Sequence, residues 1–201
     1  MAGRRIALVC AGEEVIGEHV ATVAKGLKDA GDRVVVVAPS GFAASYGLDE
    51  AGVRFATLEI PPAAELVGDA KATWNLRAML GGGAGRGPDV VHAFGTRAGL
   101  AAALSKVNSV PLVVTWWSEL AEPGTGWQDR LRDQPTRLIA RRGDVALCAS
   151  TDLVSAVLRL GARDARHVGV PVTETVAAGG SASGTEPVEQ LDALYRELTG
   201  R

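Results

Sequence analysis

The sequence has no excess of charge of either sign. Its 201 residues include 21 Lys and Arg and 23 Asp and Glu, for a formal net charge of −2 at pH 7. Proteins that bind nucleic acid or anionic membranes through their net charge are usually strongly basic. The composition gives no such electrostatic signal, and we expect no nucleic-acid partner.

Long apolar runs and cysteines are also scarce. The N-terminal apolar run 6–10 is far too short for the hydrophobic region of a signal peptide, and no stretch approaches the length of a membrane span. We therefore expect no membrane span and a cytoplasmic location. Cys10 and Cys148 each end an apolar run, which favours buried reduced thiols over a disulfide. We expect neither a metal nor a cofactor.

Short β-branched runs alternate with helical patterns along the chain. The continuous apolar character of most of these runs is typical of strands buried on both faces. Such alternation predicts an α/β fold, a single Rossmann-like parallel sheet with helices on both faces. About seven strands are expected, at Arg5–Cys10, Arg33–Ala38, Arg54–Ile60, Asp89–Phe94, Pro111–Trp117, Val145–Ala149 and Arg166–Val170.

Two helices have clear signals at their ends. Apolar spacing predicts a helix over 17–30, and Gly31 is placed to end it. Ser150 or Thr151 can cap a later helix, which stops at Gly161. The inward positions of these two helices are Val20, Val23, Ala24 and Leu27 in the first, and Leu153, Val157 and Leu160 in the second.

Several segments resemble one known family. Residues 4–41, RRIALVCAGEEVIGEHVATVAKGLKDAGDRVVVVAPSG, resemble the opening strand-loop-helix-strand unit of family-4 glycosyltransferases of the GT-B fold. Matching segments follow in family order, at PDVVHAFGTRAGLAAAL (88–104), VPLVVTWW (110–117) and DVALCASTDLVSAVLRLGA (144–162), and PVEQLDALYRELTGR (187–201) resembles the closing helix. In intact members the donor-binding domain lies between the last two segments. Nothing here corresponds to it, so the resemblance implies an acceptor-side domain alone.

The resemblance divides the chain into three parts. Residues 1–172 form the Rossmann-like domain, 173–186 a Gly/Ser-rich linker, and 187–201 the closing helix. A helix this short is marginal in water and needs a surface to bury its apolar stripe. We expect it to dock on its own domain through Val188, Leu191, Leu194, Tyr195 and Leu198.

Chemistry in such a sheet belongs to the loops at the carboxyl ends of the strands. The first of these loops has Gly12 and Gly17 but no G-x-G-x-x-G phosphate motif. Glu13 and Glu14 stand where the family has a Gly-Gly pair that approaches the donor diphosphate. Two carboxylates at a helix start favour the helix dipole, and they also argue against phosphate binding, since like charges in a confined site repel. His19 is either a solvated or capped residue or a ligand contact.

The second loop follows His92 and Phe94. Family members often have another histidine where Phe94 stands, and a lone strand histidine such as His92 is more typical of the core than of catalysis. Gly95 and Arg97 begin the next helix. A cation in a first helical turn opposes the dipole, so Arg97 either lies near an anion or acidic partner or is simply solvated.

The third loop contains Trp116, Trp117, Ser118 and Glu119. The family has a histidine where Trp117 stands, and an indole cannot accept a proton. Neighbouring strand residues point to opposite faces, so one tryptophan is expected to line or cover the crevice. Together with Phe94 it either anchors a partner at an open face or folds inward and plugs the crevice. Glu119 is a weak candidate for a base, as is His92.

Three functional interpretations follow. The first is a glycosyltransferase-derived acceptor-type domain, shortened naturally or by engineering, that is inactive alone, a pseudoenzyme. The second is the acceptor-binding half of a two-chain glycosyltransferase whose partner binds the nucleotide sugar. The third is a Rossmann-like domain that binds a small metabolite. A homodimer or a donor-domain partner would dock at the strand-end crevice.

Overall fold

The computed structural model describes residues 3–12, 14–81, 87–106, 109–117, 133–168 and 186–200. Seven strands form one sheet: β1 (Arg5–Cys10), β2 (Arg33–Ala38), β3 (Arg54–Thr57), β4 (Val90–Phe94), β5 (Leu112–Trp116), β6 (Val145–Cys148) and β7 (Ala165–His167). The described helices are α1 (Glu14–Asp29), α2 (Phe42–Ser45), α3 (Leu66–Leu80), α4 (Gly95–Ser105), α6 (Gln134–Arg142), α7 (Thr151–Leu160) and α9 (Glu186–Thr199).

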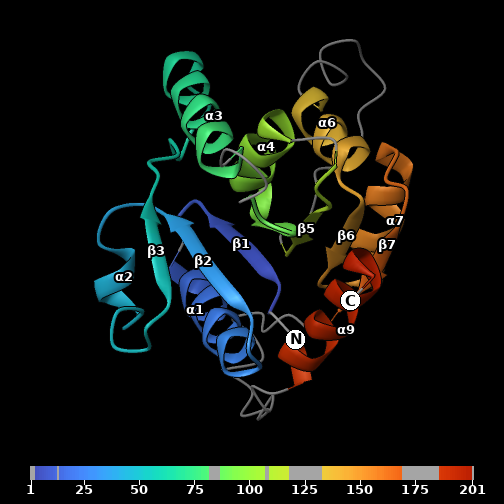
Figure 1. Cartoon of the computed structure of the whole chain (residues 1–201). Coiled ribbons are helices and arrows are strands. Elements are labelled where there is room, and N and C mark those ends of the chain that lie inside the picture. Colours follow the sequence, from blue (N-terminus) through green and yellow to red (C-terminus); the bar gives the residue numbers. More distant parts are fainter. Residues whose placement is uncertain are drawn as a thin grey trace.

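All seven strands pair in parallel, in the order β3-β2-β1-β4-β5-β6-β7 (Figure 1). The predicted α/β fold is therefore confirmed. β3 ends at Thr57 rather than Ile60, because Thr57 pairs with Ala38, the last residue of its neighbour β2. β7 ends at His167, and residues 169 and 170 of its predicted range lie outside the described part of the chain.

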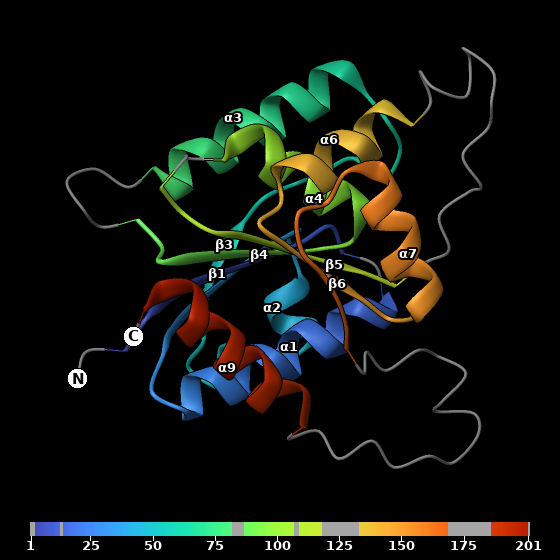
Figure 2. The same ribbon diagram turned by 90° about the vertical axis from the view of Figure 1, so that its right-hand side faces the viewer.

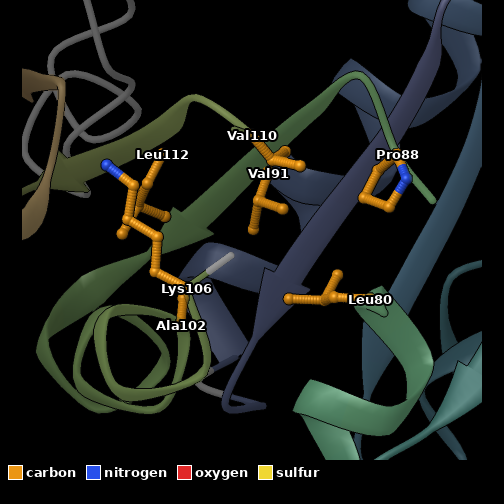
Figure 3. A pocket seen from close by; sticks show the side chains of 7 residues that line it. All are labelled: Leu80, Pro88, Val91, Ala102, Lys106, Val110 and Leu112. Atoms are coloured by element: carbon orange, nitrogen blue, oxygen red, sulfur yellow. The ribbon is translucent and has the colours of Figure 1, made fainter. Parts of the chain in front are cut away.

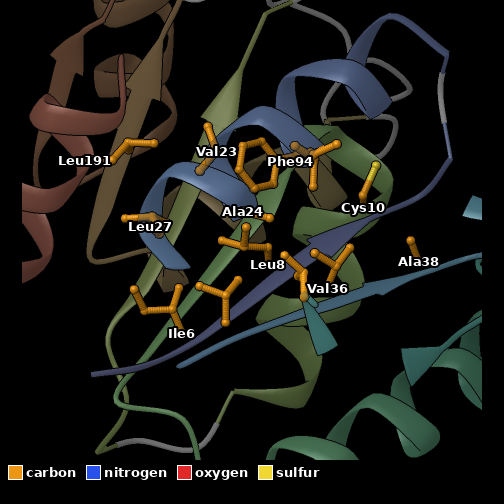
Figure 4. Close-up of a cluster of buried hydrophobic side chains, with 14 of the residues drawn as sticks. Ile6, Leu8, Cys10, Val23, Ala24, Leu27, Val36, Ala38, Phe94 and Leu191 are labelled. Carbon is orange, nitrogen blue, oxygen red and sulfur yellow. The ribbon is translucent and has the colours of Figure 1, made fainter. Parts of the chain in front are cut away.

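Helices cover both faces of the sheet (Figure 2). Alternate strand residues point to opposite faces, so each strand contributes to two apolar cores. The first core contains Ile6, Leu8 and Phe94 and lies under α1, α2 and α9 (Figure 4). The second contains Ala7, Val9 and neighbours from the other strands, under α3, α4, α6 and α7. This double coverage explains why the strands are apolar at consecutive positions.

The predicted stops at Gly31 and Gly161 and the predicted cap of α7 are confirmed, whereas α1 begins at Glu14 rather than at residue 17. Gly31 follows α1 with φ 97°, a conformation that favours glycine. Ser150 caps α7, its hydroxyl accepting a hydrogen bond from the Leu153 amide, and Gly161 ends that helix. Cys10 and Cys148 are buried free thiols, as expected. Within the described ranges, no helix combines the length and apolar character that crossing a bilayer requires.

The C-terminal helix packs back on the sheet domain, as predicted. Leu191, Leu194 and Tyr195 of α9 are buried in the first core, beside α1 and β4. Gly26 of α1 lets α9 approach closely, because a Cβ added there would lie 2.7 Å from the Val188 side chain. Residues 173–185 of the predicted linker lie outside the described residues.

Two ion-pair groups secure α9 at its edges. The nearly buried guanidinium of Arg4 pairs with Asp32 at 2.6 Å and with Asp192 of α9. The guanidinium of Arg166 on β7 bonds both carboxylate oxygens of Glu197, at 2.7 and 2.8 Å. The helix is therefore held by charged contacts as well as by its apolar stripe.

Candidate functional site

The candidate site lies where the strand order reverses, between β1 and β4. In an open α/β sheet, ligands bind outside the carboxyl ends of the strands at this switch point. The loop after Cys10 and the start of α4 after Phe94 meet there, because Cys10 pairs with Phe94. The described residues of the first two predicted loops are thus brought together.

Gly12 and Gly95 shape the backbone at this edge. Gly12 has φ 93°, and a Cβ there would lie 2.9 Å from Cγ of Pro39. Gly95 has φ 84°, and a Cβ there would lie 2.7 Å from the Trp117 ring. Any side chain at either position would be strained and crowded. The two glycines therefore let the side chains of Pro39 and Trp117 pack directly against the backbone after β1 and β4.

Phe94 and Trp117 form an aromatic stack behind Gly95. Their ring centroids are 6.3 Å apart at 21°, and Phe94 is only 1% exposed. Trp117 is partly buried against the same core. The sequence left two alternatives for these aromatics, an open face that anchors a partner or an inward plug. The first is wrong for Phe94, because its ring points into the first core at the carboxyl end of β4.

Trp116 points to the opposite face, as the strand alternation predicted. It is buried in the second core, and its indole Nε1 has no hydrogen-bond partner among the described residues. Trp117, rather than Trp116, is therefore the tryptophan next to the crevice. This choice required the tertiary structure, because either residue satisfied the alternation.

His19 lies at the edge of the aromatic stack. Its ring meets Phe94 edge-on, with centroids 5.9 Å apart. Burial lowers the pKa of His19 to about 4, because the charged form loses its hydration. The imidazole is therefore neutral at pH 7 and can both donate and accept one hydrogen bond.

His92 is the centre of a buried polar chain. Its Nδ1 lies 2.5 Å from the Tyr195 hydroxyl oxygen, and its Nε2 lies 2.6 Å from the Thr115 hydroxyl oxygen. Burial, with a smaller contribution from the charge of His19, lowers its pKa to about 3. The ring also stacks on Phe94 at 4.1 Å. With both nitrogens engaged and no exposure, His92 is a satisfied core residue, as the sequence favoured.

The sequence analysis missed the two partners of His92. Tyr195 was placed in an apolar stripe, and its hydroxyl was given no role. Thr115 lies two residues before Trp117 and therefore points to the same face of the sheet, but alternation alone did not say that His92 lies on that face. Burial raises the pKa of Tyr195, which keeps its hydroxyl protonated and able to donate.

Arg97 is tied to α3 rather than to the crevice. Its guanidinium pairs with Asp69 and donates to the carbonyls of Pro61 at 2.8 Å and Ala63 at 3.0 Å. Of the two alternatives predicted for Arg97, an acidic partner or solvation, the acidic partner is correct. The hydrogen bonds of its three guanidinium nitrogens all go to Asp69 of α3 or to the loop before α3.

The other predicted site residues divide into two groups. Gly17 lies in α1 against Tyr46, and a Cβ there would overlap the phenol ring, so this glycine has a packing role. Glu13, Ser118, Glu119 and the side chain of Glu14 lie outside the described residues. Their ligand roles stay predictions, as do those of the other crevice residues.

A small apolar pocket lies at the opposite edge of the sheet (Figure 3). It opens at the amino ends of β4 and β5, away from the switch point. Its one charged lining group, Lys106, is held by Asp144 at 2.7 Å and by the Arg142 carbonyl at 2.9 Å. The lining residues are Leu80, Pro88, Val91, Ala102, Lys106, Val110 and Leu112. Among the described lining residues, the one charged side chain is already paired, so none offers a free charged group to orient a ligand.

The fold, with its switch point between β1 and β4, defines a Rossmann-like domain of the kind found in GT-B glycosyltransferases. Residues 16–173 match the family described as Glycosyl transferase 4-like domain. The chain belongs to this family. Among curated proteins, none matches the sequence significantly.

Solved structures give the same fold at low sequence identity. Sucrose-phosphate synthase 27_220_406_426 from Thermosynechococcus elongatus matches with a TM-score of 0.67 and 15% identity, over 97% of this chain and 99% of that one. A glycosyltransferase from Rickettsia africae matches with a TM-score of 0.61 and 11% identity, over 98% and 50%. HepE from Anabaena in complex with UDP matches with a TM-score of 0.55 and 18% identity, over 82% and 43%. The chain thus spans less than half of the HepE chain.

Proposed function

We propose that this chain is a glycosyltransferase-derived acceptor-type domain that lacks the donor-binding domain and transfers no sugar alone. The observation that carries the proposal is the direct return of α9 to the sheet. Only residues 169–185 separate the described end of the β7 region from α9. Domains need roughly 50 residues or more, so no nucleotide-binding domain fits in that interval.

The similar structures support this division of the fold. The Rickettsia africae glycosyltransferase matches nearly all of this chain with half of its own length. The sucrose-phosphate synthase structure, whose name gives two separate residue ranges, matches this chain almost end to end. A protein of similar fold and almost the same extent as this chain is therefore known as a folded unit.

The side chains at the crevice also favour an inactive domain. Trp117 stands where the family has a histidine, and Phe94 where it often has another. His19 is a titratable group that meets the Phe94 ring edge-on, with centroids 5.9 Å apart. With a pKa of about 4, it is a weak base at pH 7, whereas general-base catalysis works best with a pKa near the operating pH.

Donor binding tests the proposal directly. We expect no saturable binding of UDP- or GDP-sugars at millimolar concentration, where an affinity worth only about −4 kcal/mol is detectable. Titration calorimetry and ligand-detected NMR would measure it. Simple glycosides in the same panel test the acceptor side, with His19→Ala as the crevice variant and Thr22→Ala, exposed on the same helix, as its control.

The outcomes separate the three interpretations. Saturable nucleotide-sugar binding near one-to-one stoichiometry would contradict the proposal. Transfer activity that appears only on mixing with a donor-binding protein would establish the two-chain glycosyltransferase. Binding of a non-sugar metabolite that His19→Ala abolishes would favour the Rossmann-like binder. Sedimentation beside the binding assay tests the proposed homodimer or donor-domain partner at the crevice.

The substitution Trp117→His tests whether the chain is an enzyme that lost its catalytic activity through this one residue. Replacing the indole removes its packing on Phe94 and on the backbone of Gly95. Large-to-small changes at packed sites cost about 1–3 kcal/mol when partly exposed. We expect lower thermal stability or weaker self-association, and no sugar transfer. A variant of unchanged stability and oligomeric state with new transferase activity would identify a damaged enzyme instead.

A further inference from the structure

The outer side of α3 is unusually apolar for a solvent-facing helix. Leu66 is 91% exposed, Val67 76% and Trp74 74%. By contrast, α7 exposes one large apolar side chain, Leu158, at 47%. We use "outer face of α3" for the exposed residues on this side of the helix, which are Leu66, Val67, Ala70, Lys71, Trp74, Arg77 and Ala78.

The inner side of α3 is apolar as well. Ala72, Leu76 and Leu80 pack into the second core. A helix that is apolar on opposite sides is normally buried on both of them. The α3 helix lies at the periphery, on the other side of the sheet from α9, so the docked C-terminal helix does not cover it (Figure 2). The outer face of α3 therefore has the composition of a surface that another molecule covers.

We propose that the outer face of α3 pairs with the same face of a second copy of the chain, with the two helices antiparallel. A contact across a two-fold axis brings one patch against itself, so the patch must be self-complementary. The outer face of α3 meets this condition in the sizes of its side chains and in its charges. The proposal does not depend on the sugar site.

Large apolar side chains face small ones in this arrangement. The rise along a helix is about 1.5 Å per residue, so a two-fold axis at the level of Ala72 places Trp74 of each copy level with Ala70 of the other. The same axis places Leu66 level with Ala78. A small residue opposite a large one lets two helix axes approach to about 8–10 Å. The indole and the leucine would then leave water.

Opposite charges meet at both ends of the pair. The axis places Arg77 level with Val67 of the second copy, and Glu65 lies two residues farther along that helix, within reach of a guanidinium. Both Glu65 and Arg77 are exposed, and neither forms an ion pair within the described part of the chain. Lys71 lies at the solvent edge, where salt screens the repulsion between copies. Each copy thus supplies both partners of two ion pairs.

The area available sets the strength of this contact. The three large apolar side chains present on the order of 400 Å² per copy, to which the alanines and the stem of Arg77 add. An interface of about 1,000 Å² in total is at the small end of specific protein contacts. We therefore expect a weak, reversible dimer rather than an obligate one.

Sedimentation equilibrium of the whole chain tests the proposal. We expect a monomer–dimer equilibrium between roughly 10 μM and 1 mM. Trp74→Ser should weaken it by more than about a hundredfold, since a symmetric dimer loses this anchor twice. Arg77→Glu should weaken it by about tenfold, because two attractive pairs become repulsive. Adding Glu65→Arg to Arg77→Glu restores opposite charges between identical copies and should recover most of the association.

Leu158→Ser is the matched control. It removes an exposed leucine from α7, on the same side of the sheet, and should leave the dimer unchanged. Circular dichroism checks that each variant folds. A chain that stays monomeric throughout this range, whether or not it binds lipid vesicles or another protein, would overturn the proposal. So would a dimer that Trp117→His weakens and Trp74→Ser leaves intact, which would lie at the crevice, or a double charge variant that associates no better than Arg77→Glu.

Discussion

Removal of residues 186–201 is expected to leave a chain that does not fold stably. Leu191, Leu194 and Tyr195 are nearly or fully buried by docking on the first core. Burial of side chains of this size contributes about 1.5–3 kcal/mol each, or about 5–9 kcal/mol together. Small domains have about 5–15 kcal/mol of total stability. The loss is therefore comparable with the whole free energy of unfolding.

The deletion would also remove one hydrogen-bond partner from each of two buried polar groups. Arg4 would keep Asp32 but lose Asp192, and His92 would lose the Tyr195 hydroxyl. Each buried group left without a hydrogen-bond partner costs about 1–3 kcal/mol more. Thermal and urea unfolding, with light scattering, would measure the effect. Tyr195→Phe removes only the hydroxyl and therefore measures what its hydrogen bond to His92 contributes to stability. Glu189→Ala, on the exposed side of α9, is the control. An unchanged melting temperature and solubility after deletion would refute the docking role of α9.

Acid is expected to destabilise the protein through His92, well above the pH at which carboxylates titrate. The pKa of His92 is about 3 in the folded chain and near 6.5 when unfolded. Below pH 6.5 the unfolded chain therefore binds a proton that the folded chain does not, so stability falls as the pH falls. The slope approaches about 1.4 kcal/mol per pH unit below about pH 5.5, so the loss between pH 6.5 and 4.5 is about 2 kcal/mol.

Urea titrations at several pH values between 6.5 and about 4.5 would measure this slope. His92→Gln removes the titrating ring while keeping one donor and one acceptor, so its stability should depend less on pH in this window. His19, whose pKa burial lowers to about 4, adds to the slope in the same direction. His167→Gln, at an exposed position of β7, is the matched control and should retain the slope. Equal slopes for the wild type and His92→Gln would contradict a neutral buried imidazole.

The crevice shows where reasoning from the sequence reached its limit. Alternation along β5 put Trp116 and Trp117 on opposite faces but could not say which faced α1. Arg97 was read with an acidic partner or solvent as alternatives, because Asp69 is distant in sequence. Both answers depend on which elements pack together across the sheet, and local patterns contain no information about that.

The sequence by itself determined the strands, the parallel sheet, the ends of α1 and α7 and the apolar stripe of α9. Each follows from local rules: the spacing of apolar residues, a capping hydroxyl, or a glycine that can adopt positive φ. Only the tertiary structure decided that Phe94 turns inward, that Tyr195 and Thr115 satisfy His92, and that Trp74 remains exposed. These facts concern contacts between residues far apart in the chain, where burial and hydrogen bonding are set by the packing of whole elements.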